Sequence, residues 1–149
     1  MTIISFEELY KICSEDNKAI FEVAQEDEAR LSETSVEVIR LKVLEDLIAM
    51  RESIKNGLKS KEKSISNWCG DDCVKLCDRY NKQSALFGKL FEKIITYALA
   101  TAEENLRMGR IVACPTAGSC GIVPAVLIAI SEEKEISESK LIDGLLTAG

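Results

Sequence analysis

The sequence predicts an all-α protein, a single helical domain of about six to seven helices with one loop of unusual composition. Apolar residues recur every three to four positions in several segments, as in helices that bury one face. Alternation typical of a strand is limited to the short segment 110–113. Both prolines lie in residues 114–127, a Gly/Pro/Ser/Thr loop that leads into an apolar helix. With 149 residues, 46% apolar and 30% charged, the chain has the size and composition of one globular domain.

Capping residues predict the first two helices. Ser5 and Glu8 fit a capping box, so a short helix is expected from there to about Ile12. Ser14 or Asp16 is expected to cap the next helix. The apolar face of that helix consists of Ile20, Phe21, Val23, Ala24 and Leu31.

A broad apolar stripe predicts a long third helix, capped by Thr34 or Ser35 and followed by Gly57 in the C′ position. Core packing is the first interpretation of the stripe, and a partner-binding helix is the alternative. The stripe consists of Val36, Ile39, Val43, Leu47, Met50 and Ile54. The polar residues 59–67 that follow predict an exposed connection.

The second half predicts four further helices. Residues 68–73 form a turn into a short helix that ends at about Tyr80. The strongest periodicity covers residues 84–108, with Gly109 expected at the C′ position.

Two apolar segments predict the last two helices. Residues 122–130 are apolar on every side, which predicts a buried helix with Pro124 in its first turn. Ser137 is expected to cap a final helix.

Charge and composition exclude several classes of function. The net charge is −6 without a basic block, so no nucleic-acid partner is expected. No apolar run approaches 18 residues, and the first six residues do not resemble a secretory signal, so we expect no membrane association and a cytoplasmic protein. Six cysteines in a reducing cytosol favour free thiols, metal ligands or redox sites over disulfides. The absence of histidine excludes a histidine-based triad within this chain.

Two polar clusters precede the loop. Cys69, Cys73 and Cys77 are spaced four residues apart, and on a helix such thiolates could hold zinc or an iron–sulfur cluster. The alternative is that they are buried free cysteines. Asp71 and Asp72 are typical of a helix start, with a catalytic role as the alternative.

The loop itself could bind a small ligand. Thr116 and Ser119 supply hydroxyls, while Gly118 and Gly121 permit positive φ and close backbone approach. The loop lacks the lysine of a phosphate-binding P-loop, so a nucleoside triphosphate is not expected. A carboxylate-bearing ligand at the following helix N-terminus is one interpretation, and a buried helix–helix turn is the other.

Residues 108–127, with the core Pro-Thr-Ala-Gly-Ser-x-Gly-x-x-Pro, resemble the α chain of the iron–sulfur-dependent L-serine dehydratases (L-serine deaminases). A less specific likeness extends over most of the chain and is weakest in residues 59–67. The resemblance implies an all-α fold and a lyase that removes water from L-serine by β-elimination, giving pyruvate and ammonia. It also implies a [4Fe–4S] cluster, one iron of which acts as a Lewis acid on the substrate hydroxyl.

By the same resemblance, Thr116, Ala117, Gly118 and Ser119 bind the substrate, and no catalytic residue is assigned. Cys114 and Cys120 stand where the family accepts alanine or threonine, so neither is a metal ligand. The family's cluster cysteines follow the Thr-Ala-Gly at residues 147–149. Residues 1–149 are therefore expected to be the N-terminal portion of an α chain. This portion would lack the cluster, be inactive alone, and work with a β chain or β domain.

Two other functions stay open: a related amino-acid lyase such as an L-cysteine desulfidase, and a non-catalytic helical interaction module. We also expect Leu141, Leu145 and Leu146, with the helix at 122–130, to be exposed on a truncated face. Such a face would cause self-association.

Overall fold

Seven α-helices form the part of the chain that the computed structural model describes, residues 5–83 and 87–149. A single 3₁₀ turn, Ala117–Ser119, precedes α6. These residues contain no strand, so the all-α prediction is confirmed and segment 110–113 has no regular structure. The helices are α1 Phe6–Asp16, α2 Ile20–Leu31, α3 Val36–Gly57, α4 Asp72–Lys82, α5 Lys89–Leu106, α6 Ile122–Glu133 and α7 Glu138–Ala148.

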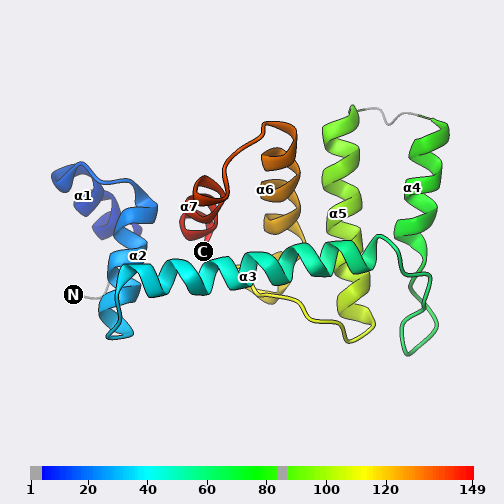
Figure 1. The fold of residues 1–149 in the computed structure, drawn as a ribbon, viewed down its shortest axis with the longest axis horizontal. Helices are drawn as coiled ribbons and strands as arrows, with labels where there is room; N and C mark the ends of the chain where they lie inside the picture. Colours follow the sequence, from blue (N-terminus) through cyan, green and yellow to red (C-terminus); the bar gives the residue numbers. More distant parts are fainter. Residues whose placement is uncertain (1–4, 84–86) are drawn as a thin grey trace.

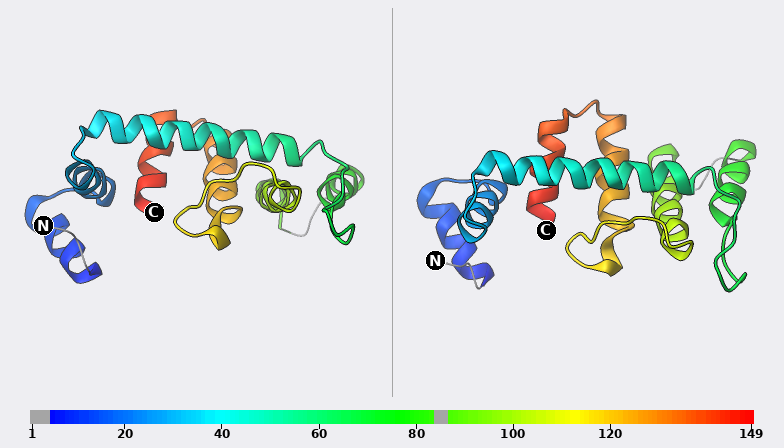
Figure 2. Two further views of the ribbon diagram at one scale, coloured as in Figure 1. Left: turned by 90° about the horizontal axis from the view of Figure 1, so that it is seen from below. Right: turned by 60° about the horizontal axis from the view of Figure 1, so that its bottom comes forward.

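The long helix α3 lies across a row of other helices (Figure 1). The row runs α2, α7, α6, α5, α4, and each member packs against the next. Seen from below, these helices all lie on one side of α3 (Figure 2). This arrangement pairs α2 with α7, which come from opposite ends of the chain, and leaves α1 and α4 at the two ends of the molecule.

The main core lies where α3 meets α6 and α7, and it includes one residue of the loop. The predicted stripe on α3 is confirmed as core packing, since four of its six residues are buried. A buried leucine or isoleucine contributes about 1.5–3 kcal/mol each. The buried cluster consists of Leu47, Met50, Ile54, Cys114, Ile128, Leu141, Ile142 and Leu145.

Arg40 of α3 ties α2 and α7 together. Its guanidinium donates to Gln25 Oε1 of α2 at 3.0 Å and to Asp143 Oδ1 of α7 at 2.8 Å. A further hydrogen bond of 3.0 Å reaches the Ser139 hydroxyl. The planar group of an arginine can satisfy several acceptors at once, so one side chain fixes three helices.

Gly57 is required by helix packing, and the prediction that it lies just beyond the helix at C′ is wrong. It is the last residue of α3, and a Cβ placed there would lie 2.1 Å from the Ala100 carbonyl oxygen of α5. No side chain fits at that distance. The backbones of α3 and α5 therefore approach more closely here than any other residue type would permit.

Three helices begin after the N-cap residue that the sequence predicts. Ser5 and Ser35 accept hydrogen bonds from the amides of Glu8 and Val38, at 3.2 and 3.4 Å. Ser137 occupies the N-cap of α7 but makes no side-chain cap bond.

The first helix is longer than the sequence predicts, because Asn17 ends it in a left-handed conformation. Ser14 and Asp16 therefore lie inside α1, and neither caps α2. The Ala19 amide instead donates to Glu22 Oε2 at 2.8 Å, so the glutamate alone provides the cap.

The expected start of the fifth helix at residue 84 lies outside the described residues, and α5 begins at Lys89. The helix ends at Leu106, two residues before the predicted end, and the C′ position lies one residue before the predicted Gly109. Met108 takes the C′ position with φ 65°, and the Gly109 amide donates to the Glu104 carbonyl at 2.9 Å. This is a Schellman motif, with methionine rather than glycine in the left-handed position.

Buried Glu103 connects α5 to the start of α4. Its side chain is 2% exposed, and Oε1 accepts from the amides of Asp72 at 2.8 Å and Cys73 at 3.1 Å. The side chain of Asp71, the N-cap residue, makes no cap bond, so Glu103 takes over that function from another helix. Arg107, 7% exposed, lies 3.5 Å from Glu103 Oε2 and balances the buried charge.

The expectation of an exposed face on α7 is wrong. Leu141 and Leu145 are buried against α3, and Leu146 packs on the same core. In α6, Pro124, Ala125 and Ile128 are buried as predicted, but Ile122 is exposed. None of the described helices combines the length and apolar character that a membrane span needs.

The Glu103 contacts predict a large loss of stability when this side chain is removed. Glu103→Ala leaves the buried Cys73 amide without its acceptor and leaves Arg107 with Glu104 as its remaining carboxylate, so the free energy of unfolding should fall by about 1–3 kcal/mol. Glu103→Gln keeps the acceptor for the α4 amides and should lose less. Chemical denaturation measures both. Glu133→Ala, at an exposed site at the end of α6, is the matched control and should change stability by no more than about 0.5 kcal/mol.

The close approach at Gly57 predicts opposite effects for two Gly→Ala changes. Gly57→Ala forces α3 and α5 apart and should destabilise the protein by about 1–3 kcal/mol. Gly144→Ala, inside α7, meets only an ordinary contact of 3.4 Å with Leu127 and should stabilise by about 0.5–1 kcal/mol. Thermal unfolding of the two variants provides the comparison, and equal effects would contradict the packing argument.

Candidate functional site

The candidate loop, residues 114–121, connects the irregular segment after α5 to α6, and the last six residues of the predicted stretch 114–127 form the start of α6 (Figure 2). It begins with a cis peptide bond between Cys114 and Pro115. Thr116 is extended, with φ −115° and ψ 160°, and the 3₁₀ turn follows directly. Residues 115–118 are exposed, whereas Cys114 and Cys120 on either side of them are buried. The two thiols anchor the loop in the core, and the predicted substrate residues face outward.

The Ser119 hydroxyl holds the loop in shape. It donates to the Cys114 carbonyl oxygen and accepts from the Thr116 amide at 3.3 Å. The Thr116 Oγ1 lies 3.1 Å from the same atom. The structure therefore brings the hydroxyls of Thr116 and Ser119 together, but the serine hydroxyl forms its hydrogen bonds inside the turn. Thr116 offers the more accessible hydroxyl.

Two backbone amides are left free at the outer edge of the turn. Within residues 5–83 and 87–149, the N–H groups of Ala117 and Gly118 have no hydrogen-bond acceptor. Both residues are exposed, so these amides are accessible to a ligand. Adjacent free amides at the start of a helical turn favour an anionic group.

Gly118 and Gly121 could adopt positive φ, but neither does so. Gly121 is needed for packing, since a Cβ there would lie 3.1 Å from the Ala98 carbonyl oxygen of α5. Gly118 has no such constraint: an added Cβ would meet only Thr116 Oγ1, at 3.7 Å. Neither packing nor backbone conformation thus explains the glycine at position 118.

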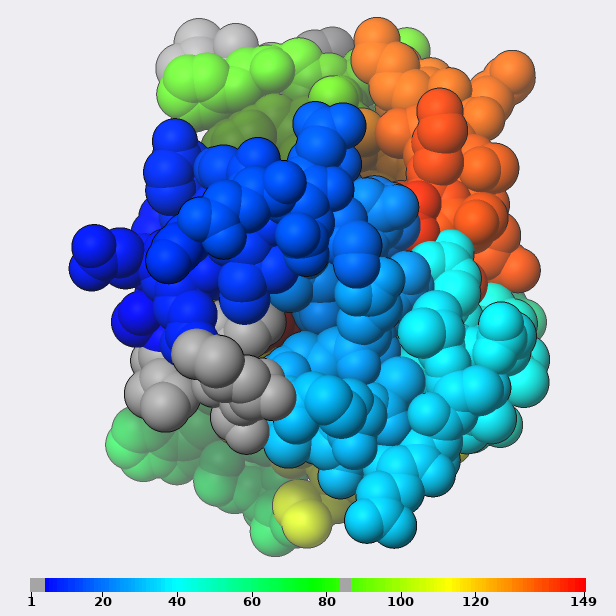
Figure 3. Space-filling view, turned by 90° about the vertical axis from the view of Figure 1, so that its left-hand side faces the viewer, coloured from blue at the N-terminus to red at the C-terminus, as the bar shows by residue number. Residues whose placement is uncertain are grey.

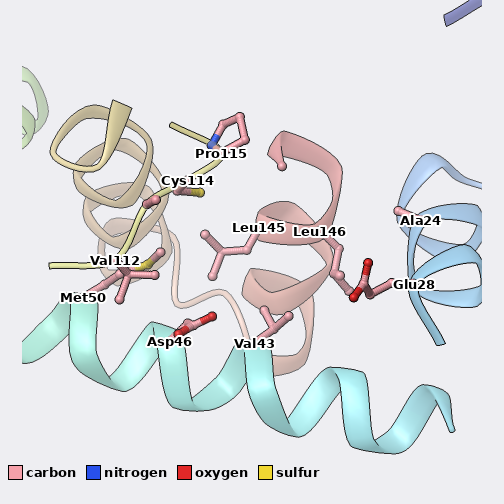
Figure 4. A pocket seen from close by; sticks show the side chains of 12 residues that line it. Ala24, Glu28, Val43, Asp46, Met50, Val112, Cys114, Pro115, Leu145 and Leu146 are labelled. Carbon is pink, nitrogen blue, oxygen red and sulfur yellow. The ribbon is translucent and has the colours of Figure 1, made fainter. Parts of the chain in front are cut away.

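A pocket of about 270 Å³ lies behind the start of the loop (Figure 4). Asp46 of α3 and Leu145 of α7 point into it, opposite Cys114 and Pro115. Within the described part of the chain, the Asp46 carboxylate has no ion pair or hydrogen bond. The pocket is lined by Ala24, Glu28, Val43, Asp46, Met50, Val112, Ala113, Cys114, Pro115, Leu145, Leu146 and Gly149.

The sequence offered little signal for Asp46, since it is one of several acidic residues on α3. Its position beside the apolar stripe, next to Leu47, was the sole hint. Its negative charge adds to the effect of burial in raising the pKa of the Cys114 thiol, and burial is the larger cause. Cys114 is therefore a neutral thiol of the core and not a nucleophile.

The cysteines at 69, 73 and 77 are not gathered around a common point. Cys69 is exposed, whereas Cys73 is buried and donates to the Thr96 carbonyl at 3.5 Å. Burial, together with the charges of Cys77 and Glu103, raises the pKa of Cys73 to about 12. Among the described residues, no three Cys, Asp or Glu side chains are grouped so that they could hold a metal ion.

Asp71 and Asp72 lie at the start of α4, and both pair with Lys75 one turn later. A hydrogen bond from Lys75 is the largest factor that lowers the pKa of Asp71. This arrangement fits the interpretation of the two acids as residues of a helix start. The positive charges of Lys63 and Lys61 lower the pKa of Asp71 further, so its surroundings stabilise the ionised carboxylate.

These environments predict an order of thiol labelling. Cys69 should react first with an alkylating reagent at pH 8, whereas the buried Cys73, Cys114 and Cys120 should stay protected until the protein unfolds. Raising the pH to 10 should leave Cys73 protected, because its pKa of about 12 keeps the thiol neutral. Mass spectrometry after a labelling pulse gives the order, with a fully denatured sample as control. Early labelling of Cys73 would contradict this.

Comparison with known proteins places the chain in a family. Residues 15–149 match the family described as serine dehydratase alpha chain. The L-serine dehydratase alpha chain of Peptoniphilus asaccharolyticus is 30% identical over 141 residues, which are 95% of this chain and 48% of that protein. The probable L-serine dehydratase alpha chain of Bacillus subtilis (strain 168) is 34% identical over 142 residues, 95% of this chain and 47% of that one.

A third relative shows a shorter and stronger likeness. L-serine dehydratase 1 of Escherichia coli (strain K12) is 64% identical over 31 residues, 21% of this chain and 7% of that protein. The chain spans about half the length of the alpha chains that it matches. On the extent of these matches, the chain belongs to the serine dehydratase alpha chain family.

Proposed function

We propose that this chain is part of an L-serine ammonia-lyase and that its exposed loop binds the carboxylate of the substrate. The reaction removes water from L-serine by β-elimination, and the aminoacrylate that forms is hydrolysed through its imine to pyruvate and ammonia. Membership of the family and the names of its relatives support the reaction. The observation that carries the binding role is the pair of free, exposed amides at Ala117 and Gly118.

The turn offers a carboxylate two amide donors and one hydroxyl. The Ala117 and Gly118 amides and Thr116 Oγ1 lie at its outer edge, and hydrogen bonds to a charged acceptor contribute about 1.5–3 kcal/mol each. Ser119 acts indirectly, since its hydroxyl closes the turn that holds these donors. The missing side chain at Gly118, which packing does not require, leaves room for the ligand to reach the backbone.

In our proposal, this chain provides neither the ligands of the cluster nor the β partner of the enzyme. The described residues provide no ligand set for the [4Fe–4S] cluster that the resemblance implies. We place the cluster ligands in the part of the longer enzyme beyond these 149 residues, together with a β chain or β domain. The role of this chain is then to bind and orient L-serine, and the isolated chain should form no pyruvate.

Removal of one amide donor tests the loop in the complete enzyme. Ala117→Pro deletes an N–H at the first position of the turn, and the extended Thr116 before it has the conformation that a following proline prefers. We expect the KM for L-serine to rise about 10- to 100-fold, as the loss of one charged hydrogen bond implies. The measurement is pyruvate formation, and Ala117→Ser, which keeps the N–H, is the control.

An unchanged KM in Ala117→Pro, with an unchanged melting temperature, would refute the carboxylate site. Parallel assays with L-serine and L-cysteine separate the dehydratase from a cysteine desulfidase. A complete enzyme that converts neither substrate would leave the helical interaction module as the function of this chain and refute the lyase.

A further inference from the structure

The whole net charge of the protein resides in its first two helices. Residues 5–35 contain nine of the 25 acidic side chains but three of the 19 basic ones. The rest of the chain, with sixteen of each kind, is neutral overall. Because α1 and α2 lie together at one end of α3, the excess negative charge is confined to one end of the molecule (Figure 1). We name this surface, residues 5–35, the acidic end.

The basic residues of the acidic end are already neutralised within it. Lys11 pairs with Glu15 at 3.8 Å, Lys18 pairs with Glu26 at 2.6 Å, and Arg30 pairs with a neighbouring aspartate. Glu7, Asp16 and Glu33 are exposed, and among the described residues no cation pairs with them. The local field of this end is therefore set by unpaired carboxylates.

The acidic end also presents an uncovered apolar face. No residue of α1 is buried, although the helix is amphipathic and packs on α2. Phe6 and Tyr10, one helical turn apart, are 75% and 66% exposed. Seen end-on, α1 and α2 lie at the front of the molecule (Figure 3). Two aromatic side chains beside free carboxylates are typical of a surface that binds a partner.

The opposite end has the complementary chemistry. The connection between α3 and α4, residues 59–70, contains Lys59, Lys61 and Lys63, all exposed. Within the described part of the chain, none of these three lysines forms an ion pair. Ile65 and Trp68 in the same connection are 82% and 91% exposed. We name residues 59–70 the basic hairpin.

The basic hairpin is an ordered structure. The Ser64 amide donates to the Cys69 carbonyl at 2.8 Å, and the Cys69 amide donates to Ser64 Oγ at 3.3 Å. An isolated bridge between Lys63 and Gly70 closes it at its base. Its two apolar side chains are thus held outward by hydrogen bonds, which lowers the entropy cost of binding through them.

We propose that the acidic end of one copy of this chain binds the basic hairpin of a second copy. The lysines of the hairpin face the free carboxylates, and Trp68 and Ile65 pack against Phe6 and Tyr10. Opposite charges steer the encounter, while the aromatic contact supplies the affinity. The two surfaces lie at opposite ends of α3 (Figure 1), so each molecule can use both at once. This is a contact between two different surfaces, unlike the like-to-like contact of a symmetric pair.

Trp68 is the single tryptophan of the chain and reports directly on this contact. In about 20 mM salt, its emission should shift to shorter wavelength as protein concentration rises, and the mass measured by light scattering should rise in parallel. In about 0.5 M salt both changes should need a higher protein concentration, because screening weakens the attraction between the two charged surfaces. A chain that stays monomeric at low salt, or one whose association is unaffected by salt, would overturn the proposal.

Charge reversal gives the sharper test. The variant Lys61→Glu/Lys63→Glu makes both ends acidic, and Asp16→Lys/Glu33→Lys lowers the net charge of the acidic end from −6 to −2. Each variant alone should associate at least tenfold more weakly than the parent, whereas an equimolar mixture of the two should associate again. The control Lys134→Glu/Lys140→Glu changes the net charge as the first variant does, at exposed sites on neither surface, and should associate as the parent does.

Circular dichroism confirms that each variant is folded. A mixture that stays monomeric would overturn the proposal, as would equal weakening by the control. If the single variants associate as strongly as the parent, the contact lies elsewhere, and another surface or another protein covers these two ends.

Discussion

The fold depends on how closely two other segments approach the backbone of α5. Gly57 at the end of α3 packs against the Ala100 carbonyl, and Gly121 before α6 packs against the Ala98 carbonyl. A side chain at Gly57 would separate α3 from α5, and one at Gly121 would crowd the α5 backbone at 3.1 Å, so α5 is held between α3 and the loop by backbone contact. The candidate loop therefore has a fixed position relative to the long helix, although most of its own surface is exposed.

That position explains how the loop combines order with accessibility. Cys114 and Cys120 are buried on either side of it, and the Ser119 hydroxyl joins its two halves. The two thiols and the serine hydroxyl stabilise the loop. The groups that remain available to a ligand are the amides of Ala117 and Gly118 and the Thr116 hydroxyl. A rigid support with free backbone donors is the usual requirement of an anion site.

Charged residues serve two separate purposes in this chain. Glu103 and Arg107 are buried, and their value is structural, since they cap α4 from a neighbouring helix and neutralise each other. The carboxylates of Glu7, Asp16 and Glu33 and the lysines of the basic hairpin are exposed and, within the described part of the chain, form no ion pair, so they contribute little to folding. They instead give the molecule opposite charges at its two ends, and long-range attraction between molecules depends on that separation.

The sequence by itself determined the helices, because periodicity and capping are local properties. The stripe on α3, Ser5, Ser35 and Pro124 were all read correctly, and the family was evident from the residues around Thr116. The C′ positions assigned to Gly57 and Gly109 were wrong, because the sequence does not distinguish a glycine where the backbone turns from one that another helix approaches. Tertiary structure alone placed Glu103 at the α4 amides, Asp46 behind Cys114 and α2 against α7. Each depends on contacts between residues far apart in the chain, and local patterns carry no record of such contacts.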